Sequence, residues 1–268
     1  MASSGDERRM VFDIRGRRKN VVKAVYAVLA LLMGLSLLLV VGPFSIAEIF
    51  NDGQSNNSGD IYIEQAERVE QKLNKDPDNP DLLANLTKAR INAGNALVEV
   101  NPETGAGQIT SEGRIELEKA SEAWSQYLEA TDEPSAGLAQ AAARTLFSLA
   151  ETARTNGEIQ NNIKAARDAQ LIVAEQRPSL GTLSTLATYQ LYAFDYAGAK
   201  KSEKEAGAYA NTKFERENLE NELEQIEKRA REFEKFIAEI GKAEKKAQAE
   251  GKAIPNALSE GGNPIGGP

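Results

Sequence analysis

Hydrophobic and small residues recur at helical spacing through the middle of the chain, in a pattern that returns three times. In the first copy, Leu83 is followed three positions later by a second leucine and then directly by a small residue. The same order starts at Leu146 and at Leu183. Apolar residues three and four positions apart lie on one face of an α-helix, and self-similarity of this kind is the signature of a repeat architecture. The pattern therefore predicts an array of repeated helices.

A second apolar pattern follows each copy, again with helical spacing. Its positions lie four, three and one residues apart, which places them on one side of a second helix. They are Ala120, Trp124, Tyr127 and Leu128 in the first copy, Ala166, Gln170, Val173 and Ala174 in the second, and Ala199, Glu203, Ala206 and Gly207 in the third. Each repeat is therefore expected to be a pair of helices, with Trp124, the only tryptophan, in the core.

This alternation of two helices resembles the tetratricopeptide repeat (TPR), a family of helical solenoids with about 34 residues per unit that bind other proteins. The resemblance covers about residues 61–211. The dipeptides Asp76-Pro77 and Arg177-Pro178 are 101 residues apart, close to three such periods. That spacing is a second sign of the repeat.

The turn after each first helix is expected eleven positions after its first leucine, at Gly94, Gly157 and Phe194. Glycine is usual at this position in the family, so Phe194 departs from the pattern. Arg90 and Gln190 depart from it as well, since an aromatic residue is usual where they stand.

The N-terminal part combines a basic flank with a long uncharged stretch. Residues 1–23 carry seven lysines and arginines, and residues 24–47 carry no charge. Eighteen residues, 24–41, would span about 27 Å as a helix, close to the ~30 Å hydrocarbon core of a bilayer. Because the basic flank comes first, the positive-inside rule predicts a transmembrane helix at 24–47 with a cytoplasmic N-terminus and extracytoplasmic repeats. A cleaved signal peptide is the alternative, since small residues precede Glu48 at the spacing of a cleavage site.

The remaining boundaries follow from changes in composition. A polar, glycine-containing linker is expected at 48–60, the repeats at 61–211, and a disordered tail rich in glycine and proline at 253–268. Residues 95–114 are much longer than a tight turn and hold three glycines and a proline. We therefore expect an insertion loop there, either a binding loop or a tolerated insertion.

Residues 212–252 are strongly charged and predict a long helix with one hydrophobic seam. The seam follows the heptad spacing of packed helices, and its members are Leu219, Leu223, Ile226, Ala230, Phe233, Ile237 and Ile240. Two interpretations stay open. The seam either covers the end of the repeats, or it pairs with a second copy of the chain or with a partner helix.

Composition narrows the classes of function. A formal net charge of −8 argues against nucleic-acid binding, which needs a basic face. The chain has no cysteine and no histidine, which excludes disulfides, Cys/His zinc sites and the Ser-His-Asp arrangement. It also lacks a phosphate-loop or dinucleotide-binding fingerprint. We therefore expect no enzyme activity, no cofactor and no metal.

In TPR proteins the first helices of successive units line a concave groove, and the resemblance implies which residues face it. They are Lys88 and Asn92 in the first repeat, Arg144, Glu151 and Arg154 in the second, and Thr188 and Tyr192 in the third. Lys88, Arg144 and Arg154 would form a basic strip within an acidic protein. Such a strip could hold an acidic or C-terminal peptide segment through charge-assisted hydrogen bonds.

The sequence thus predicts an all-α, bacterial, single-pass membrane protein with an N-terminal transmembrane helix, a TPR-like helical solenoid and a long charged C-terminal helix. Its expected function is that of a membrane-tethered adaptor or scaffold that binds a protein segment. One alternative is a chaperone-like accessory of protein export or envelope assembly, because the layout is similar to small anchored TPR proteins of that kind. Another is a structural homo-oligomer joined through the C-terminal seam. An enzyme or solute-binding domain is disfavoured by the absence of histidine and cysteine.

Overall fold

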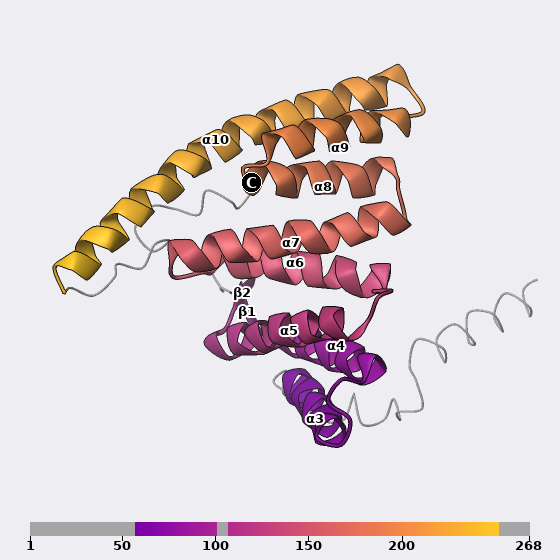
Figure 1. Ribbon diagram of the computed structural model, residues 1–268, viewed down its shortest axis with the longest axis vertical. Helices are drawn as coiled ribbons and strands as arrows, with labels where there is room; N and C mark the ends of the chain where they lie inside the picture. Colours follow the sequence, from indigo (N-terminus) through magenta and orange to yellow (C-terminus); the bar gives the residue numbers. More distant parts are fainter. Residues whose placement is uncertain (1–56, 101–106, 252–268) are drawn as a thin grey trace, which may run out of the picture. The chain divides into compact units, whose positions relative to one another are not determined.

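The computed structural model describes residues 57–100 and 107–251, all of which belong to one compact unit of the chain (Figure 1). Most of these residues are helical, so the predicted all-α class is confirmed. Within these ranges no helix is both long and apolar enough to cross a membrane. The transmembrane helix predicted at 24–47 lies outside them, as do the basic N-terminus and the tail at 253–268.

The described elements follow one another as helices, with a single pair of short strands between the second and third. They are α3 (Asn57–Leu73), α4 (Pro80–Ala96), β1 (Val98–Val100), β2 (Gly107–Ile109), α5 (Ser111–Ala130), α6 (Ala136–Glu151), α7 (Asn156–Gln176), α8 (Leu180–Tyr192), α9 (Tyr196–Ala208) and α10 (Lys213–Ala249). The linker predicted at 48–60 therefore overlaps the first turn of α3.

Helices α3 to α9 stack in chain order, each against the next, and α4 also contacts α6 (Figure 1). The pairs α4/α5, α6/α7 and α8/α9 are the helical hairpins that the sequence pattern predicts. Helix α10 departs from this order because it runs back across α9, α8 and α7.

The leucines that open the three copies of the pattern lie at different points of their helices, because Leu83 and Leu183 are each the fourth residue of α4 and α8 whereas Leu146 is the eleventh residue of α6. Leu83, Leu146 and Leu183, which open the three copies of the pattern, are all buried. The small residues four positions later are buried completely, and in the first copy the Thr87 hydroxyl donates to the Leu83 carbonyl oxygen at 2.8 Å. Trp124 is also buried, as predicted.

Side-chain caps set where most of the helices begin. An N-cap side chain that accepts from a backbone N–H of the first turn satisfies one of the unpaired donors there. Caps of this kind are made by Asn79, Thr110, Thr155, Ser179, Asp195 and Thr212. At the starts of α8 and α10 the bond is reciprocal and forms a capping box.

The segment predicted as an insertion loop at 95–114 contains two short strands in the part that the structure describes. Val98–Val100 pairs antiparallel with Gly107–Ile109, and α5 begins at Ser111. Thr110 fixes that start because its hydroxyl accepts from the Gly113 N–H at 3.0 Å. The sequence pattern missed the strands because three-residue strands are too short to show a period.

The turn positions expected at Gly94 and Gly157 are both helical. Gly94 lies inside α4, where a Cβ would collide with Leu117 and come within 2.8 Å of the Gly113 carbonyl oxygen. It is therefore a point of close helix approach. Gly157 lies in the first turn of α7, since α6 already ends at Glu151. Only Phe194 closes its helix as expected.

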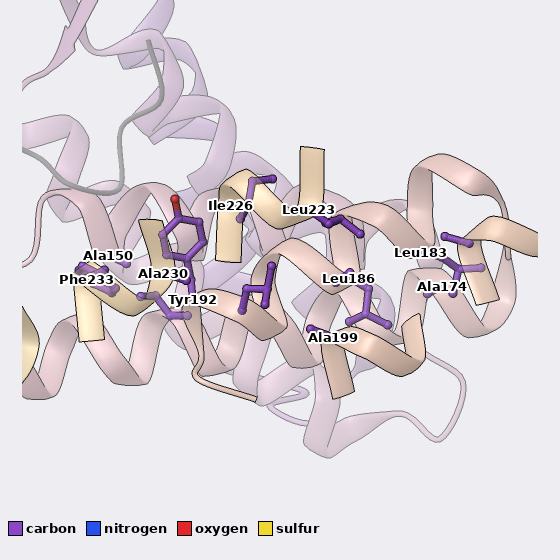
Figure 2. Close-up of a cluster of buried hydrophobic side chains, with 14 of the residues drawn as sticks. Ala150, Ala174, Leu183, Leu186, Tyr192, Ala199, Leu223, Ile226, Ala230 and Phe233 are labelled. Carbon is purple, nitrogen blue, oxygen red and sulfur yellow. The ribbon is translucent and has the colours of Figure 1, made fainter. Parts of the chain in front are cut away.

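The C-terminal helix is packed onto the repeats through its seam. Leu219, Leu223, Ile226, Ala230, Phe233 and Ile237 are all buried in one cluster with side chains of α6 to α9 (Figure 2), and Ile240 packs against this cluster while partly exposed. Self-association through the seam would have to compete with this packing, and it stays a prediction.

Candidate protein-interaction face

The first helices of the hairpins, α4, α6 and α8, carry the residues expected to bind a partner. Lys88 and Asn92 are exposed on α4, and Arg144 is exposed on α6. These three side chains are open to solvent in the chain as it stands. We call the exposed surface of the first helices α4, α6 and α8 the first-helix face, and these three side chains lie on its α4 and α6 parts.

Arg154 is exposed, but it does not lie on a helix. Because α6 ends at Glu151, Arg154 falls in the turn that leads into α7. Its backbone N–H donates to Glu158 Oε2 at 2.8 Å, which ties the turn to α7. The repeat pattern misplaced this residue because the second copy begins at Leu146, the eleventh residue of α6, so that its later positions run past the end of the helix.

Glu151 ends α6 in a half-buried position, where its charge acts on Tyr189 and Tyr192. Burial raises the pKa of its carboxyl group. Burial also raises the pKa of Tyr189, while the charge of Arg144 lowers it and that of Glu151 raises it. Arg144, in the middle of α6, and Glu151, at its C-terminal end, therefore both act on one side chain of α8. The structure brings these two predicted residues to the same part of the face.

Tyr192 is not open to a ligand, because α10 covers it. Its side chain is only 5% exposed. Its ring meets Phe147 of α6 edge-on at 5.6 Å and Phe233 of α10 edge-on at 5.9 Å. Thr188, one turn earlier, is half-buried and donates its hydroxyl to the Ser184 carbonyl oxygen at 3.0 Å. The third repeat's part of the predicted groove is thus occupied by the chain itself.

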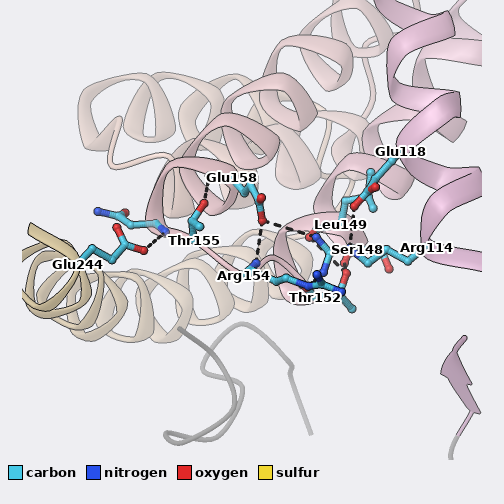
Figure 3. A network of polar contacts seen from close by, with 10 residues as sticks. Arg114, Glu118, Ser148, Leu149, Thr152, Arg154, Thr155, Glu158 and Glu244 are labelled. Carbon is cyan, nitrogen blue, oxygen red and sulfur yellow. Dashed lines mark hydrogen bonds and ion pairs between the residues drawn. The ribbon is translucent and has the colours of Figure 1, made fainter. Parts of the chain in front are cut away.

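A polar network surrounds the turn between α6 and α7 (Figure 3). Arg114 of α5 donates to the Thr152 carbonyl oxygen at 2.6 Å and pairs with Glu158 at 3.5 Å. On the other side of the turn, Glu244 Oε1 of α10 accepts from the Asn156 N–H at 2.8 Å. Side chains of α5, α7 and α10 thereby hold one turn.

A buried ion cluster joins the first three described helices. Arg90 of α4 is 3% exposed, and its guanidinium donates to Glu116 of α5 at 2.5 Å and to Glu70 of α3 at 2.6 Å. Burial would lower the pKa of Arg90, but the bonds to Glu70 and Glu116 outweigh it and the pKa is raised. Lys119 adds a bond to Glu116 at 2.8 Å.

Sequence reasoning noted Arg90 only as a departure from the repeat pattern. The sequence did contain a signal for this ion pair: it places an arginine at a core position of one helix and a glutamate at a core position of the next.

Tyr196 connects α9 to α10 through its ring and its hydroxyl. The Arg231 guanidinium lies 4.3 Å from the ring centroid, and the hydroxyl donates to Glu234 at 2.8 Å. Burial, together with this bond to a carboxylate, raises the pKa of Tyr196 to about 12. The hydroxyl therefore remains a donor throughout the neutral range.

In the ranges that the structure describes, no group of three or more acidic side chains is placed to hold a metal ion. Comparisons of the chain with protein-family models, with curated proteins and with solved structures find no match. The first-helix face is therefore interpreted from its own geometry.

Proposed function

We propose that this chain is an adaptor that binds a protein segment on the first-helix face of a TPR-like solenoid. The observation that carries the proposal is the stacking in chain order of three helical hairpins, α4/α5, α6/α7 and α8/α9, each with a buried leucine of the sequence pattern in its first helix. Stacked hairpins that repeat in this way build extended surfaces from one helix of each pair. In the described chain that surface bears exposed polar side chains.

Charge suggests the chemistry of the partner segment. Lys88 and Arg144 are exposed basic residues on this face, within a protein of net charge −8. Arg229 of α10 is also exposed, and its charge acts on Tyr192. Guanidinium groups bind carboxylates through paired, charge-assisted hydrogen bonds. The segment is therefore expected to be acidic or to end in a free carboxylate.

The membrane tether is the second part of the proposal. It is supported by the uncharged stretch at 24–47 and the basic flank before it, which together favour insertion with a cytoplasmic N-terminus. Alkaline carbonate extraction combined with mass spectrometry of the N-terminal peptide tests it. Carbonate-resistant protein that retains residues 1–47 supports the anchor, whereas a mature N-terminus at Glu48 supports a cleaved signal.

Site-specific photo-crosslinking in native membranes tests the adaptor role. A photoreactive residue at Lys88 or Arg144 is expected to capture the same protein, whereas one at Lys164, an exposed lysine of α7, is not. The charge reversals Lys88→Glu and Arg144→Glu should then abolish this capture without changing the melting temperature, because both side chains are exposed. Equal capture from Lys164, or capture that survives both reversals, would show that the first-helix face is not the binding surface.

A further inference from the structure

Large apolar side chains remain exposed around the turn that joins α9 to α10. Tyr209, the residue that follows α9, and Leu171 of α7 are both exposed, and they line the same hollow. Phe214, in the first turn of α10, is 70% exposed. Single exposed apolar residues are ordinary on a protein surface, whereas grouped ones are typical of a surface that contacts another molecule.

The hollow lies between α7 and α9 and opens over the first part of α8. Its volume is about 440 Å³, and a cavity of about 150 Å³ is enough to hold a benzene ring. Leu183 and Leu186 of α8 form its base, since both are buried in the core. The exposed residues Leu171, Ala208 and Tyr209 stand around it. The hollow is therefore an apolar recess with room for one aromatic side chain.

Phe214 takes no part in the core of its own chain. It belongs to none of the buried clusters, and it lies five residues before Leu219, where the buried seam of α10 begins. Five residues turn an α-helix by about 140° beyond one full turn, so Phe214 and the seam lie on different sides of α10. The start of α10 is fixed without this ring, by the capping box of Thr212 and Glu215. The ring is thus open to a neighbouring molecule.

We propose that two copies of the chain associate about a two-fold axis, and that Phe214 of each copy enters the hollow of the other. The ring and the hollow lie at the same end of the third hairpin, because Phe214 follows Tyr209 by only five residues (Figure 1). A two-fold interface requires that each copy offers both halves of the contact. One chain carries both halves, so a second copy is the occupant that fits.

The charges beside the ring and the hollow fit the same arrangement. Lys201 and Glu205 at the hollow form an ion pair of 3.9 Å, whereas Glu175 forms no ion pair within the described ranges. Lys213, the residue before the ring, is exposed, and its pair with Glu217 at 3.2 Å is exposed too. Exposed pairs contribute little, so Lys213 can exchange this carboxylate for another. We expect it to pair with Glu175 of the other copy.

This contact is small, since it exchanges one ring and one ion pair in each direction. Small interfaces are typical of weak, transient association. We therefore expect a monomer in dilute solution and self-association above about 10 μM. The seam of α10 stays packed on the repeats in both copies, so this contact differs from the self-association predicted through the seam. It does not depend on the adaptor function.

Substitution of the ring tests the contact. Self-association is measured with the full-length chain in detergent, by fluorescence transfer between copies labelled at the N-terminus with a donor or an acceptor. Phe214→Ser should weaken it at least about tenfold, because an aromatic anchor is lost from both copies. Ile61→Ser, at an exposed isoleucine of α3, is the matched control and should change nothing. A parent chain that stays monomeric at about 100 μM, or equal effects of the two variants, would overturn the proposal.

A mixture of two variants tests whether the ring enters the hollow. Ala208→Trp fills the hollow at an exposed position and keeps the ring, whereas Phe214→Ser keeps the hollow and removes the ring. Each variant alone has lost both contacts, but a heterodimer of the two retains one. We therefore expect the two variants to bind each other several-fold more tightly than either binds itself. A heterodimer no tighter than both homodimers would show that the ring and the hollow do not meet.

A charge exchange tests the orientation of the two copies. Lys213→Glu and Glu175→Lys should each weaken self-association several-fold, and the double variant should recover most of the parent affinity. A double variant weaker than both single variants would contradict the pair between Lys213 and Glu175.

Photo-crosslinking from position 214 in native membranes decides which molecule fills the hollow. Adducts to residues 171–178 or 201–209 of another copy support the proposal. Adducts only to a different protein would show that a second copy is not the occupant. Because the crosslinks from Lys88 and Arg144 probe another face, their success or failure bears on the adaptor function and not on this contact.

Discussion

Phe194 shows how one residue can depart from a repeat pattern and still perform the expected role. Its backbone is left-handed, with φ of 63°. The N–H of Phe194 donates to the Leu191 carbonyl oxygen at 3.0 Å, and that of Asp195 donates to Gln190 at 2.8 Å. These two bonds form the Schellman motif that ends many helices, normally with glycine. The phenylalanine keeps the strained backbone because its ring packs on Phe233.

Two substitutions at Phe194 separate backbone strain from packing. Both Phe194→Ala and Phe194→Gly lose the contact with Phe233 and should destabilise the protein. Only the glycine relieves the left-handed strain, which costs about 1–2 kcal/mol for other residues. We therefore expect the glycine variant to be about 1 kcal/mol more stable than the alanine variant, measured by urea denaturation. An alanine variant that is equally or more stable would show that the strain is negligible.

Glu151 should make stability depend on pH in a predictable direction. Burial raises its pKa in the folded chain, so the folded state holds the proton more tightly than the unfolded state. Stability is therefore lost as pH rises from the unfolded value of about 4.3 through the raised pKa.

Glu151→Gln should increase stability at neutral pH by a few tenths of a kcal/mol, a small effect because the group is only half-buried. The substitution should also flatten the pH dependence of stability between about 4 and 7. Denaturation across this range, with Glu175→Gln at an exposed position of α7 as the control, checks it. An unchanged slope in the Glu151 variant would contradict the assignment.

At the scale of elements, the repeat spacing predicted turns at Gly94 and Gly157, whereas in the structure both glycines lie inside helices. Gly94 lets α4 approach α5 at Leu117 and Gly113, whereas a Cβ at Gly157 would meet no heavy atom within 4 Å. The two glycines have the same place in the sequence pattern and opposite surroundings.

The same substitution at these two glycines should have opposite effects. Gly94→Ala forces α4 and α5 apart and should cost about 1–3 kcal/mol, as overpacking does. Gly157→Ala adds a better helix former in open space and should stabilise by up to about 1 kcal/mol. Thermal unfolding of the pair checks this, and destabilisation by both would mean that Gly157 also lies in a close contact.

At the scale of the whole described unit, the core is divided along the chain. One buried cluster joins α6 to α10, a second lies between α4 and α8, and a third joins α3, α4 and α5. When each hairpin contacts mainly its neighbours, the free energy of unfolding is approximately the sum of each hairpin's own stability and of its interfaces with the neighbouring hairpins. Damage at one end should therefore weaken that end most.

Phe233→Ala tests this division. Phe233 is completely buried, so its truncation should cost about 3–5 kcal/mol. Hydrogen exchange should accelerate most in α8, α9 and α10 and least in α3 and α4. Phe214→Ala, at a side chain that is 70% exposed, is the control and should change stability by less than about 0.5 kcal/mol. Uniform acceleration over all helices would show a single cooperative core instead.

The sequence by itself determined the class and the pairing of helices into hairpins, but not where the second copy of the pattern lies within α6. These features depend on local physics: apolar residues three and four positions apart must share a helix face, and cap residues such as Asn79 and Thr212 satisfy the first N–H groups. For the same reason Leu83, Leu146 and Leu183 could be assigned to the core in advance. Exposed Lys88, Asn92 and Arg144 also lie on the helices expected from the pattern.

Only the tertiary structure decided which of these surfaces stays open. The seam of α10 showed that this helix buries one face, but the spacing could not say against what. Its position across α8 and the α6–α7 turn buries Tyr192, brings Glu244 to Asn156 and converts part of the predicted groove into core. A sequence period records which side chains share a face. Which two faces meet depends on contacts between segments far apart in the chain, which no local period contains.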